Sequence, residues 1–369
     1  MSLFRKSPEI ISASLSRLAW VRFLHEPLGL GSLIFIGLIC ITAILGYLIT
    51  PDKTPFANQQ FLELGLKKPG FKVDILYIPG TDPPQHPGWL HRMLMGEKNS
   101  ATPIPISCYR VYRDTLFYRI YSEPGTALPA ETRIPAKGLS LPHTKTFWLG
   151  TDRFGRDYLS QLIIGARISL SVGLISVFIS LLIGISLGAI AGYFRGWADN
   201  LIMWFINVVW SIPTLLLVIA ITFALGKGFW QVFVAVGLTM WVDVARMVRG
   251  QVMGLREKEF VEAGHALGFS DSRIIIRHIL PNVMAAVIVI SAANFASAIL
   301  LEAGLSFLGL GVQPPVPSWG SMIKENYGYI ILDYAYLAIL PGIAIMLLVL
   351  AFMLMGNSLR DALDVKTRK

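Results

Sequence analysis

Six apolar runs of about twenty residues constrain the fold of this chain more than any other feature. A helix that crosses the hydrocarbon core of a bilayer needs ~20 mostly apolar residues. The first run is too long for a secretory signal peptide and no small-residue cleavage site follows it, so we interpret it as a retained span. The runs occupy residues 28–50, 169–194, 201–225, 229–245, 283–311 and 335–356. The sequence therefore predicts an all-α polytopic membrane protein with six transmembrane helices.

The composition agrees with a membrane protein and excludes other classes. Only 15% of the residues are charged, whereas soluble domains carry ~25%. The net charge of +9 could suit a nucleic acid, but the basic residues do not gather on a water-soluble face, so no nucleic-acid partner is expected. Two cysteines are too few for a disulfide framework, and Cys40 and Cys108 lie in such different surroundings that we do not expect them to meet.

The distribution of Lys and Arg predicts the orientation. Fifteen basic residues fall on the side of the N-terminus, against two, Lys227 and Lys324, in the short loops opposite. Because basic residues mark the cytoplasmic side, both termini are predicted on the cytoplasmic side of the membrane. The predicted divisions are a cytoplasmic segment 1–27, a span 28–50, an external insertion 51–165, a core of five spans 166–356 and a cytoplasmic tail 357–369.

The predicted insertion 51–165 is a unit of a different kind. It is basic, but long segments translocate largely regardless of charge. Its first part is rich in Pro and Gly, and two strand-like runs follow at residues 71–78 and 107–121. The second run could be a hairpin that turns near Arg113 and Asp114. We expect a small external domain with some β structure, either a docking platform for a partner or an inert elaboration.

No motif for catalysis, nucleotide binding or metal binding is present. The chain lacks a P-loop, a zinc helix and a nucleophile elbow, so neither an enzyme nor a resident cofactor is expected. Acidic residues within the spans are few, and intramembrane charge suggests function. Asp243 is expected to be partly solvated or ion-paired with neighbouring arginines. For Glu302, a structural interhelix hydrogen bond and a place in a pathway stay equally open.

Glycines in the second run predict a close helix contact. Gly184, Gly188 and Gly192 are four residues apart and so lie on one helix face, where a neighbouring helix can approach.

The loop at residues 250–282 is the most informative connection. Helical character at 261–267 is followed by Gly268, which can end a helix in a left-handed conformation. Ser270 is positioned as an N-cap, and a second short helix is predicted from Asp271 to a stop before Pro281. Such a helix–glycine–helix element could insert into a groove of another protein or lie on the lipid surface.

This loop resembles the EAA loop of ABC importer permeases. The matching residues are Glu262, Ala263, Gly264, Gly268, His278, Ile279, Leu280 and Pro281. Gly264 replaces the second Ala of the pattern, and His278 replaces a usually apolar residue. Residues 148–170, 301–322 and 356–364 resemble the second, C-type permease subunit of dipeptide, oligopeptide and nickel importers. The resemblance does not cover residues 51–146, so the first external loop is enlarged relative to that family.

The resemblance implies a type I ABC importer permease fold and a role in transport across a bacterial inner membrane. It implies a sister permease, two cytoplasmic ATPase subunits that hold ATP and Mg²⁺, and an extracytoplasmic binding protein. It implies ATPase coupling through Glu262, Ala263, Gly264, Gly268, Asp271, Arg273, Ile274, Ile275, Arg277, Leu280 and Pro281. A pathway or external gate would include Pro213, which would kink the third span, together with Glu302, Trp319 and Gly320. For Trp319, an interfacial anchor is the alternative.

The resemblance leaves the substrate open. Peptides are the expected substrates, and nickel chelates or peptide antibiotics are alternatives within the same architecture. A secondary transporter coupled to ions through Glu302, or a membrane scaffold with a sensory external domain, would need no EAA-type loop.

Overall fold

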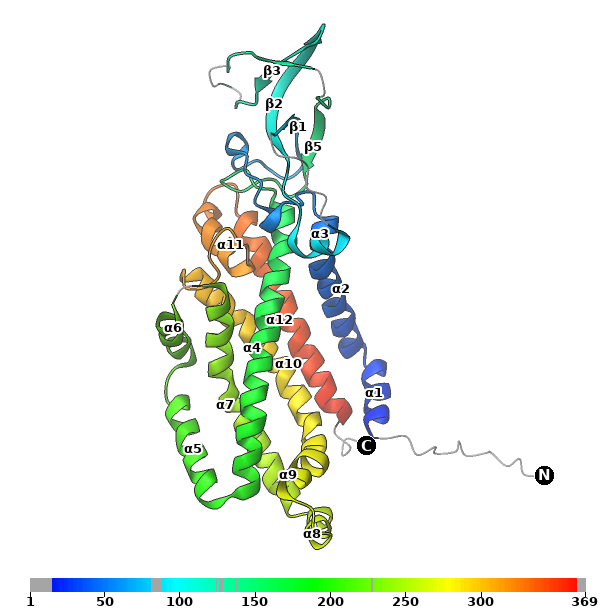
Figure 1. The fold of residues 1–369 in the computed structure, drawn as a ribbon, viewed down its shortest axis with the longest axis vertical. Helices are drawn as coiled ribbons and strands as arrows, with labels where there is room; N and C mark the ends of the chain where they lie inside the picture. The colour runs from blue at the N-terminus through cyan, green and yellow to red at the C-terminus, as the bar shows by residue number, and fades with distance from the viewer. Residues whose placement is uncertain are drawn as a thin grey trace, which may run out of the picture.

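The computed structural model describes residues 15–80, 88–123, 125, 129–136, 139–226 and 228–363, with side chains from residue 19 onward. Figure 1 shows an elongated molecule in which a bundle of helices carries a small sheet at one end. We call this the sheet end, and we call the opposite end, where helix α8 lies, the loop end. Residues 1–14 and 364–369 and Lys227, which contribute to the predicted orientation, lie outside the described residues.

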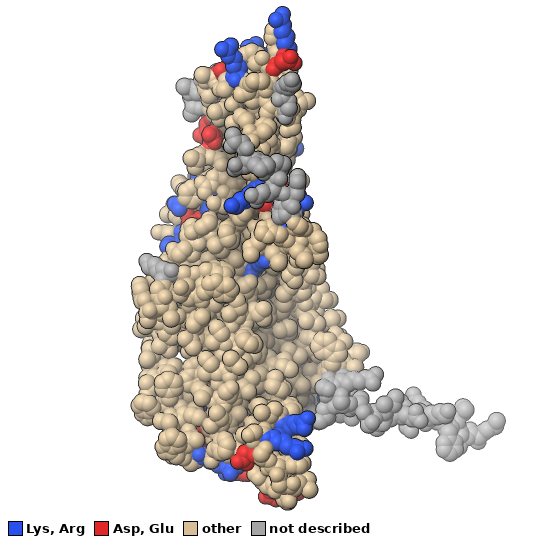
Figure 2. Space-filling view, viewed as in Figure 1, with Lys and Arg blue, Asp and Glu red and all other residues tan. Residues whose placement is uncertain are grey.

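The helices form a bundle long enough to cross a membrane. Five described helices have the length and apolar character of a span, and the bent pair α5 and α6 makes a sixth if it counts as one. In Figure 2, charged side chains gather at the two ends of the visible face, with an almost uncharged band between them. The predicted helical membrane fold is confirmed.

The helices are α1 (Leu15–His25), α2 (Pro27–Ile49), α3 (Trp89–Met95), α4 (Tyr158–Phe194), α5 (Gly196–Trp210), α6 (Thr214–Leu225), α7 (Phe229–Arg256), α8 (Glu259–Ala266), α9 (Asp271–Ile274), α10 (Leu280–Phe307), α11 (Trp319–Asn326) and α12 (Tyr336–Leu363), with short turns at Pro55–Ala57, Leu62–Leu64 and Tyr327–Ile330.

The third predicted span is broken. α5 and α6 meet at an angle of 94° across a break of three residues. Pro213 stands at the start of α6, where it has no backbone N–H to continue the hydrogen-bond ladder of α5. The kink predicted at Pro213 is therefore present, and it is a full break in the helix.

The sequence predicts that the second short helix of the loop stops before Pro281. In the structure this helix continues through Pro281. α9, a π turn over Ile275–Ile279 and α10 form one helix over residues 271–307. In the π turn the Leu280 N–H donates to the Ile275 carbonyl. A regular helix would bring the proline ring against the carbonyl four residues earlier, and the wider turn gives that ring room. The prediction was wrong because a local widening of the helix accommodates the proline.

The closest helix contact in the bundle joins α4 to α7. A Cβ added at Gly184 would lie 2.5 Å from the Val244 side chain, and one added at Gly188 would lie 2.5 Å from the Ala245 carbonyl oxygen. A Cβ at Gly192 would lie 2.7 Å from the carbonyl oxygen of Arg249. Since real Cβ atoms do not approach so closely, the three glycines allow the two helices to meet backbone to backbone.

The insertion contains a five-stranded antiparallel sheet. Its order is β4-β3-β2-β1-β5. The β2–β3 hairpin turns at Arg113 and Asp114, as predicted, with Tyr112 paired to Thr115 and Arg113 in a left-handed conformation. The strands are β1 (Phe71–Pro79), β2 (Ala101–Tyr112), β3 (Thr115–Ile120), β4 (Thr132–Pro135) and β5 (His143–Phe147). The β structure predicted for the insertion is therefore present in the fold.

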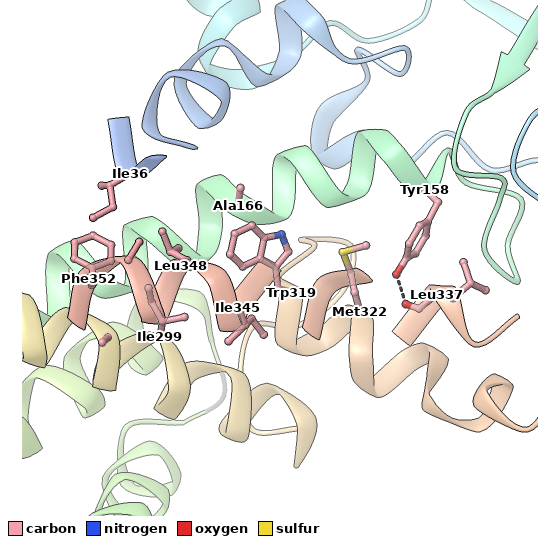
Figure 3. Packing of buried hydrophobic residues seen from close by; sticks show 12 residues of the cluster. Ile36, Tyr158, Ala166, Ile299, Trp319, Met322, Leu337, Ile345, Leu348 and Phe352 are labelled. Atoms are coloured by element: carbon pink, nitrogen blue, oxygen red, sulfur yellow. Dashed lines mark hydrogen bonds between the residues drawn. The ribbon is translucent and has the colours of Figure 1, made fainter. Parts of the chain in front are cut away.

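A buried apolar cluster holds α11 inside the bundle. Figure 3 shows Trp319 and Met322 of α11 between side chains of α4, α10 and α12. The Trp319 indole N–H donates to the Leu162 carbonyl at 2.9 Å. The Tyr158 hydroxyl, at the start of α4, donates to the Leu337 carbonyl of α12. α11 is therefore an integral part of the bundle at the sheet end.

Candidate functional site

At the loop end, α8, α9 and the π turn after α9 form a helical hairpin over residues 259–279, which we call the loop hairpin. The Phe269 N–H donates to the Gly264 carbonyl, which closes the end of α8. Gly268 has a φ of +74°, a left-handed conformation that glycine adopts without strain. The predicted helix end at Gly268 is confirmed. Ser270 occupies the predicted N-cap position, but its side chain makes no capping hydrogen bond.

The side chains of the loop hairpin divide into a buried and an exposed set. Ile274 is fully buried in a cluster shared with α4 and α7, so the prediction that it faces an outside partner is wrong. Ile274 closes the hairpin's own core, and an added Cβ at Gly264 would lie 3.5 Å from it, an ordinary contact. The large apolar side chains that do face outward are Phe260, Leu267 and Ile276, of which Leu267 is 72% exposed.

Most of the other predicted coupling residues are at the surface. Ile275 and Leu280 are half-buried. Glu262 makes no ion pair with any described residue, so a charge-assisted contact that fixes the first loop helix is not made within this part of the chain. The Arg273 guanidinium lies 4.0 Å from the centre of the Phe269 ring. The exposed predicted residues are Glu262, Ala263, Gly268, Asp271, Arg273, Arg277 and Pro281.

A tyrosine that sequence reasoning missed ties the loop hairpin to α4. The Tyr193 hydroxyl donates to the Asp271 carboxylate at 2.6 Å and lies 3.3 Å from Nε2 of His265. Tyr193 is only 3% exposed, although it stands at the last turn of α4. Asp271 is therefore exposed at the surface, and its carboxylate is also bonded to Tyr193 of the same chain. One hydroxyl joins three elements, α4, α8 and α9, at the base of the hairpin.

Two ion pairs fix the turn between α4 and α5 against α7. The Arg195 guanidinium lies 2.6 Å from the Glu257 carboxylate. The Arg249 guanidinium donates to both carboxylate oxygens of Asp199, at 2.6 Å for the Nη2 contact. Arg249 is thus occupied by Asp199 and is not paired with Asp243, the partner that the sequence suggests.

At the sheet end, Glu302 is fully buried among hydroxyl groups, which we call the hydroxyl cluster. The Ser306 hydroxyl donates to the Glu302 carboxylate at 2.7 Å, and the Ser169 hydroxyl of α4 donates at 3.4 Å. Ser318, the N-cap of α11, lies 3.4 Å from Ser306. This arrangement agrees with a structural interhelix hydrogen bond, the first of the two readings of Glu302.

Trp319 and Gly320 pack beside the hydroxyl cluster. Trp319 is 2% exposed, so it cannot be an interfacial anchor. A Cβ added at Gly320 would lie 2.6 Å from the Cα atom of Ala303, so α11 meets α10 backbone to backbone here. Both residues therefore position α11 against α10.

A buried charged network joins the insertion to α11. The Arg156 guanidinium lies 2.5 Å from Asp152 and 2.6 Å from Glu325. Asp152 and Arg156 are both nearly inaccessible to solvent. Burial raises the pKa of Asp152, although the Arg156 guanidinium and backbone N–H groups oppose the shift. Arg156 lies in the segment before the second span that resembles the C-type permeases, but the sequence gives no sign of its buried partners.

A hollow of about 330 Å³, lined by apolar and polar residues, opens beside the break between α5 and α6. Asp243 of α7 is exposed at its wall, and Asn294 of α10 faces it with only 6% of its surface exposed. Other lining residues come from α5, α6, α7 and α10. Pro213, which ends the break, adjoins the hollow, whereas Glu302, Trp319 and Gly320 do not line it. The residues predicted for a pathway are therefore not gathered at one place.

Comparison with known proteins assigns the family. Residues 184–369 match the family described as the binding-protein-dependent transport system inner membrane component, and this match spans half of the chain. The chain belongs to this family. Residues 14–69 of the permease match a second model, the N-terminal transmembrane domain of oligopeptide transport permease C. The permease is thus an inner-membrane protein of the dipeptide and oligopeptide branch of ABC importers, as its resemblance predicted.

Two relatives of the permease, found by sequence, agree with this assignment. The glutathione transport system permease protein GsiD of Pectobacterium atrosepticum is 42% identical over 221 residues, which cover 60% of this chain and 73% of the relative. The dipeptide transport system permease protein DppC of Alkalihalophilus pseudofirmus is 42% identical over 239 residues, which cover 65% of this chain and 78% of the relative. Among solved structures, a chain of the inward-facing MetNI methionine ABC transporter aligns with a TM-score of 0.46 and 18% sequence identity. The alignment covers 55% of this chain and 95% of the MetNI chain.

Proposed function

We propose that this permease is one transmembrane subunit of an ATP-driven peptide importer and docks an ATPase through the loop hairpin. One observation carries the proposal. The loop hairpin protrudes at the loop end (Figure 1), exposes Phe260, Leu267 and Ile276 beside charged residues, and continues through the π turn into α10. A protruding element with apolar and charged groups suits a groove on a partner, and its continuity with a spanning helix suits the transmission of movement.

The partners follow from this proposal. A sister permease would complete the pathway as a heterodimer, two cytoplasmic ATPase subunits would hold ATP and Mg²⁺, and an extracytoplasmic binding protein would deliver substrate at the sheet end. The loop end and both termini would face the cytoplasm. This chain would then bind no cofactor and catalyse no reaction, and its states would interchange as the ATPases close and open.

Relatives named for dipeptide and glutathione transport support peptides as the substrate class. Nickel chelates and peptide antibiotics are the alternatives, and competition for uptake of a labelled dipeptide separates the three. Ion-coupled transport is disfavoured because the chain matches the family of binding-protein-dependent transport components.

The docking proposal is tested by two variants in vesicles reconstituted with all partners. Gly268→Pro requires a φ near −65° where the chain has +74°, so the hairpin should lose its shape. Glu262→Lys reverses an exposed charge on α8. Both should abolish ATP-driven dipeptide uptake while membrane insertion persists. Gly254→Ala is the matched control, because nothing lies within 4 Å of an added Cβ there. Unchanged uptake in both variants would refute docking by the loop hairpin.

The insertion has a candidate surface for the binding protein. Tyr109, Val111 and Tyr112 near the tip of the β2–β3 hairpin are 41%, 49% and 62% exposed. We expect replacement of all three by Ser to weaken capture of the binding protein while the strand pairing persists. Unchanged affinity and unchanged uptake would favour an inert insertion.

A further inference from the structure

The hollow beside the broken span brings five polar side chains together among apolar ones. Its wall includes hydroxyl, amide and carboxylate groups from α6, α7 and α10, and the lengths of α7 and α10 place Asp243 and Asn294 near the middle of their helices. The polar lining residues are Thr214, Thr239, Asp243, Asn294 and Ser297.

Two of these groups have no partner within the described part of the chain. Asp243 forms no ion pair there, because the Arg249 guanidinium is bound to Asp199 and that of Arg246 lies 3.8 Å from the centre of the Trp210 ring. The side-chain nitrogen of Asn294 is buried and makes no hydrogen bond with any described residue.

Both features are costly in a membrane unless something binds there. A carboxylate at membrane depth faces a water-filled cavity or a partner charge. Irregular backbone, such as the break that ends at Pro213, is tolerated at that depth only where it is covered by protein or lines a cavity. Interrupted spanning helices commonly border the substrate sites of other transporters. The hollow combines all three features.

We propose that the hollow is a subsite of the transport pathway that accepts the cationic end of the substrate. Asp243 binds the α-ammonium group of a peptide, and the Asn294 amide donates to its first carbonyl. Ser297 and Thr239 line the same wall and provide further hydrogen-bonding groups. This assignment rests on the proposed peptide transport. It identifies Asp243 and Asn294 as the residues that would recognise the amino end of the peptide.

The test places a cysteine in the hollow. Ser297 is exposed there, so Ser297→Cys in a Cys40→Ser, Cys108→Ser chain gives this subunit a single thiol, which lies in the hollow. Aminoethyl methanethiosulfonate, a cation, should react about tenfold faster than the anionic sulfonatoethyl reagent, because Asp243 attracts the cation. Adding Asp243→Asn should remove this preference, whereas Asp333→Asn, at an exposed site outside the hollow, should keep it.

A second measurement asks whether the substrate occupies the hollow. A free dipeptide should slow modification of the thiol, and its N-acetylated form should not. Equal rates for the two reagents, no reaction with either, or protection independent of the amino group would overturn the subsite. Absence of peptide uptake by the unmodified transporter would instead overturn the proposed function, so the two failures are distinguishable.

A different observation concerns helix α3 of the insertion. None of its seven residues is buried, and Trp89, Leu90, Leu94 and Met95 are 68%, 51%, 45% and 61% exposed. A helix of seven residues is too short to be stable in water by itself. Its exposed apolar side chains form a patch on the surface of this chain, and such patches mark contact with a partner or a membrane.

The contacts of α3 place it level with the end of α2. The Arg167 guanidinium donates to the Leu94 carbonyl at 2.8 Å, and lies 5.7 Å from the centre of the Tyr47 ring, in the last turn of α2. Gly96, just after α3, packs against the same tyrosine. Figure 1 shows α3 beside the sheet end of α2. The exposed side chains of Leu48 and Ile49 continue the apolar surface onto α2.

We infer that α3 rests in the lipid leaflet at the sheet end and anchors the insertion to the bilayer. Its apolar residues face the acyl chains, while Arg92, paired with Glu97 at 3.1 Å, stays at the polar boundary. Trp89 occupies the level at which aromatic residues gather at membrane interfaces.

Spin labels test this position in the assembled transporter in lipid nanodiscs. Labels at Leu90→Cys and Met95→Cys, in the chain without native cysteines, should collide more with oxygen than with a water-soluble nickel chelate. A label at Tyr112→Cys, at the exposed sheet tip, should show the reverse. Water-like collisions at 90 and 95, or shielding from both reagents by a protein partner, would overturn the lipid contact.

Discussion

The helix bundle and the sheet of the insertion are stabilised in different ways. In the bundle, Gly184, Gly188 and Gly192 bring α4 and α7 together so closely that no added atom fits. The sheet instead closes two small apolar clusters around Ile75 and Leu76, and many of its residues stay exposed. The bundle should therefore be sensitive to added volume, whereas the surface of the sheet can change. Between them lies a buried joint of charged groups.

The largest expected effect is at that joint. Arg156→Ala leaves Asp152 and Glu325 without their buried partner, and should destabilise the protein by about 3–5 kcal/mol. Arg110→Ala removes only an exposed pair with Glu131 and should cost less than about 1 kcal/mol. Denaturation in detergent micelles compares the two. Equal losses would mean that the sheet is not joined to α11 through Arg156.

The next effect tests the bundle itself. Gly188→Ala forces its Cβ against the Ala245 carbonyl and should destabilise the protein by about 1–3 kcal/mol. Gly250→Ala, on the exposed side of α7, has nothing within 4 Å of the new Cβ and should not destabilise the protein. Thermal unfolding measures the stability of both variants. An unfolding temperature that Gly188→Ala leaves unchanged would show that α4 and α7 can move apart without cost.

A smaller effect separates stability from coupling. Tyr193→Phe loses the hydrogen bond to Asp271, worth about 1 kcal/mol, and should lower the ratio of peptide uptake to ATP hydrolysis. Tyr109→Phe, at an exposed site of the sheet, should leave that ratio unchanged. If Tyr193→Phe keeps the normal ratio, the hydroxyl does not position the loop hairpin.

The smallest effect concerns an exposed ion pair and depends on pH. The Lys67 ammonium, 2.6 Å away, lowers the pKa of Glu123. Because the folded pKa lies below the unfolded value, the pair adds stability above the ordinary carboxyl range and loses it as the pH falls through the folded pKa. Glu123→Gln should therefore lower the unfolding temperature slightly at pH 7, and the difference should shrink below about pH 4. A difference independent of pH would assign the effect to packing.

The sequence predicts what depends on local pattern. Apolar runs locate the spans, and the turn at Arg113 and Asp114 follows from alternating residues with a polar break. The start of α4 at Tyr158, eleven residues before its apolar run, could not be predicted, because an Asp157 cap and buried tertiary contacts stabilise polar turns there. The burial of Ile274 depends in the same way on contacts made by distant helices.

The candidate site was predicted in outline only. The resemblance located the loop hairpin but not Tyr193, whose role depends on residues more than seventy positions away. The hollow could not be predicted because its polar residues come from three helices that are distant in the sequence, and only the folded bundle brings them to one wall. The sequence identifies Asp243 as a charge within a span. That it has no ion-pair partner among the described residues could not be predicted, because this follows from the pairing of Arg249 with Asp199.

The two longest helices are joined to each other at both ends. α4 and the helix over residues 271–307 each contain 37 residues and are therefore about 55 Å long. Tyr193 bonds to Asp271 at the loop end, and Ser169 bonds to Glu302 toward the sheet end. Two rods joined at two separated points form a frame: they can tilt together, but sliding one along the other breaks a joint. A push on the loop hairpin would then arrive at the sheet end as a rotation of this frame.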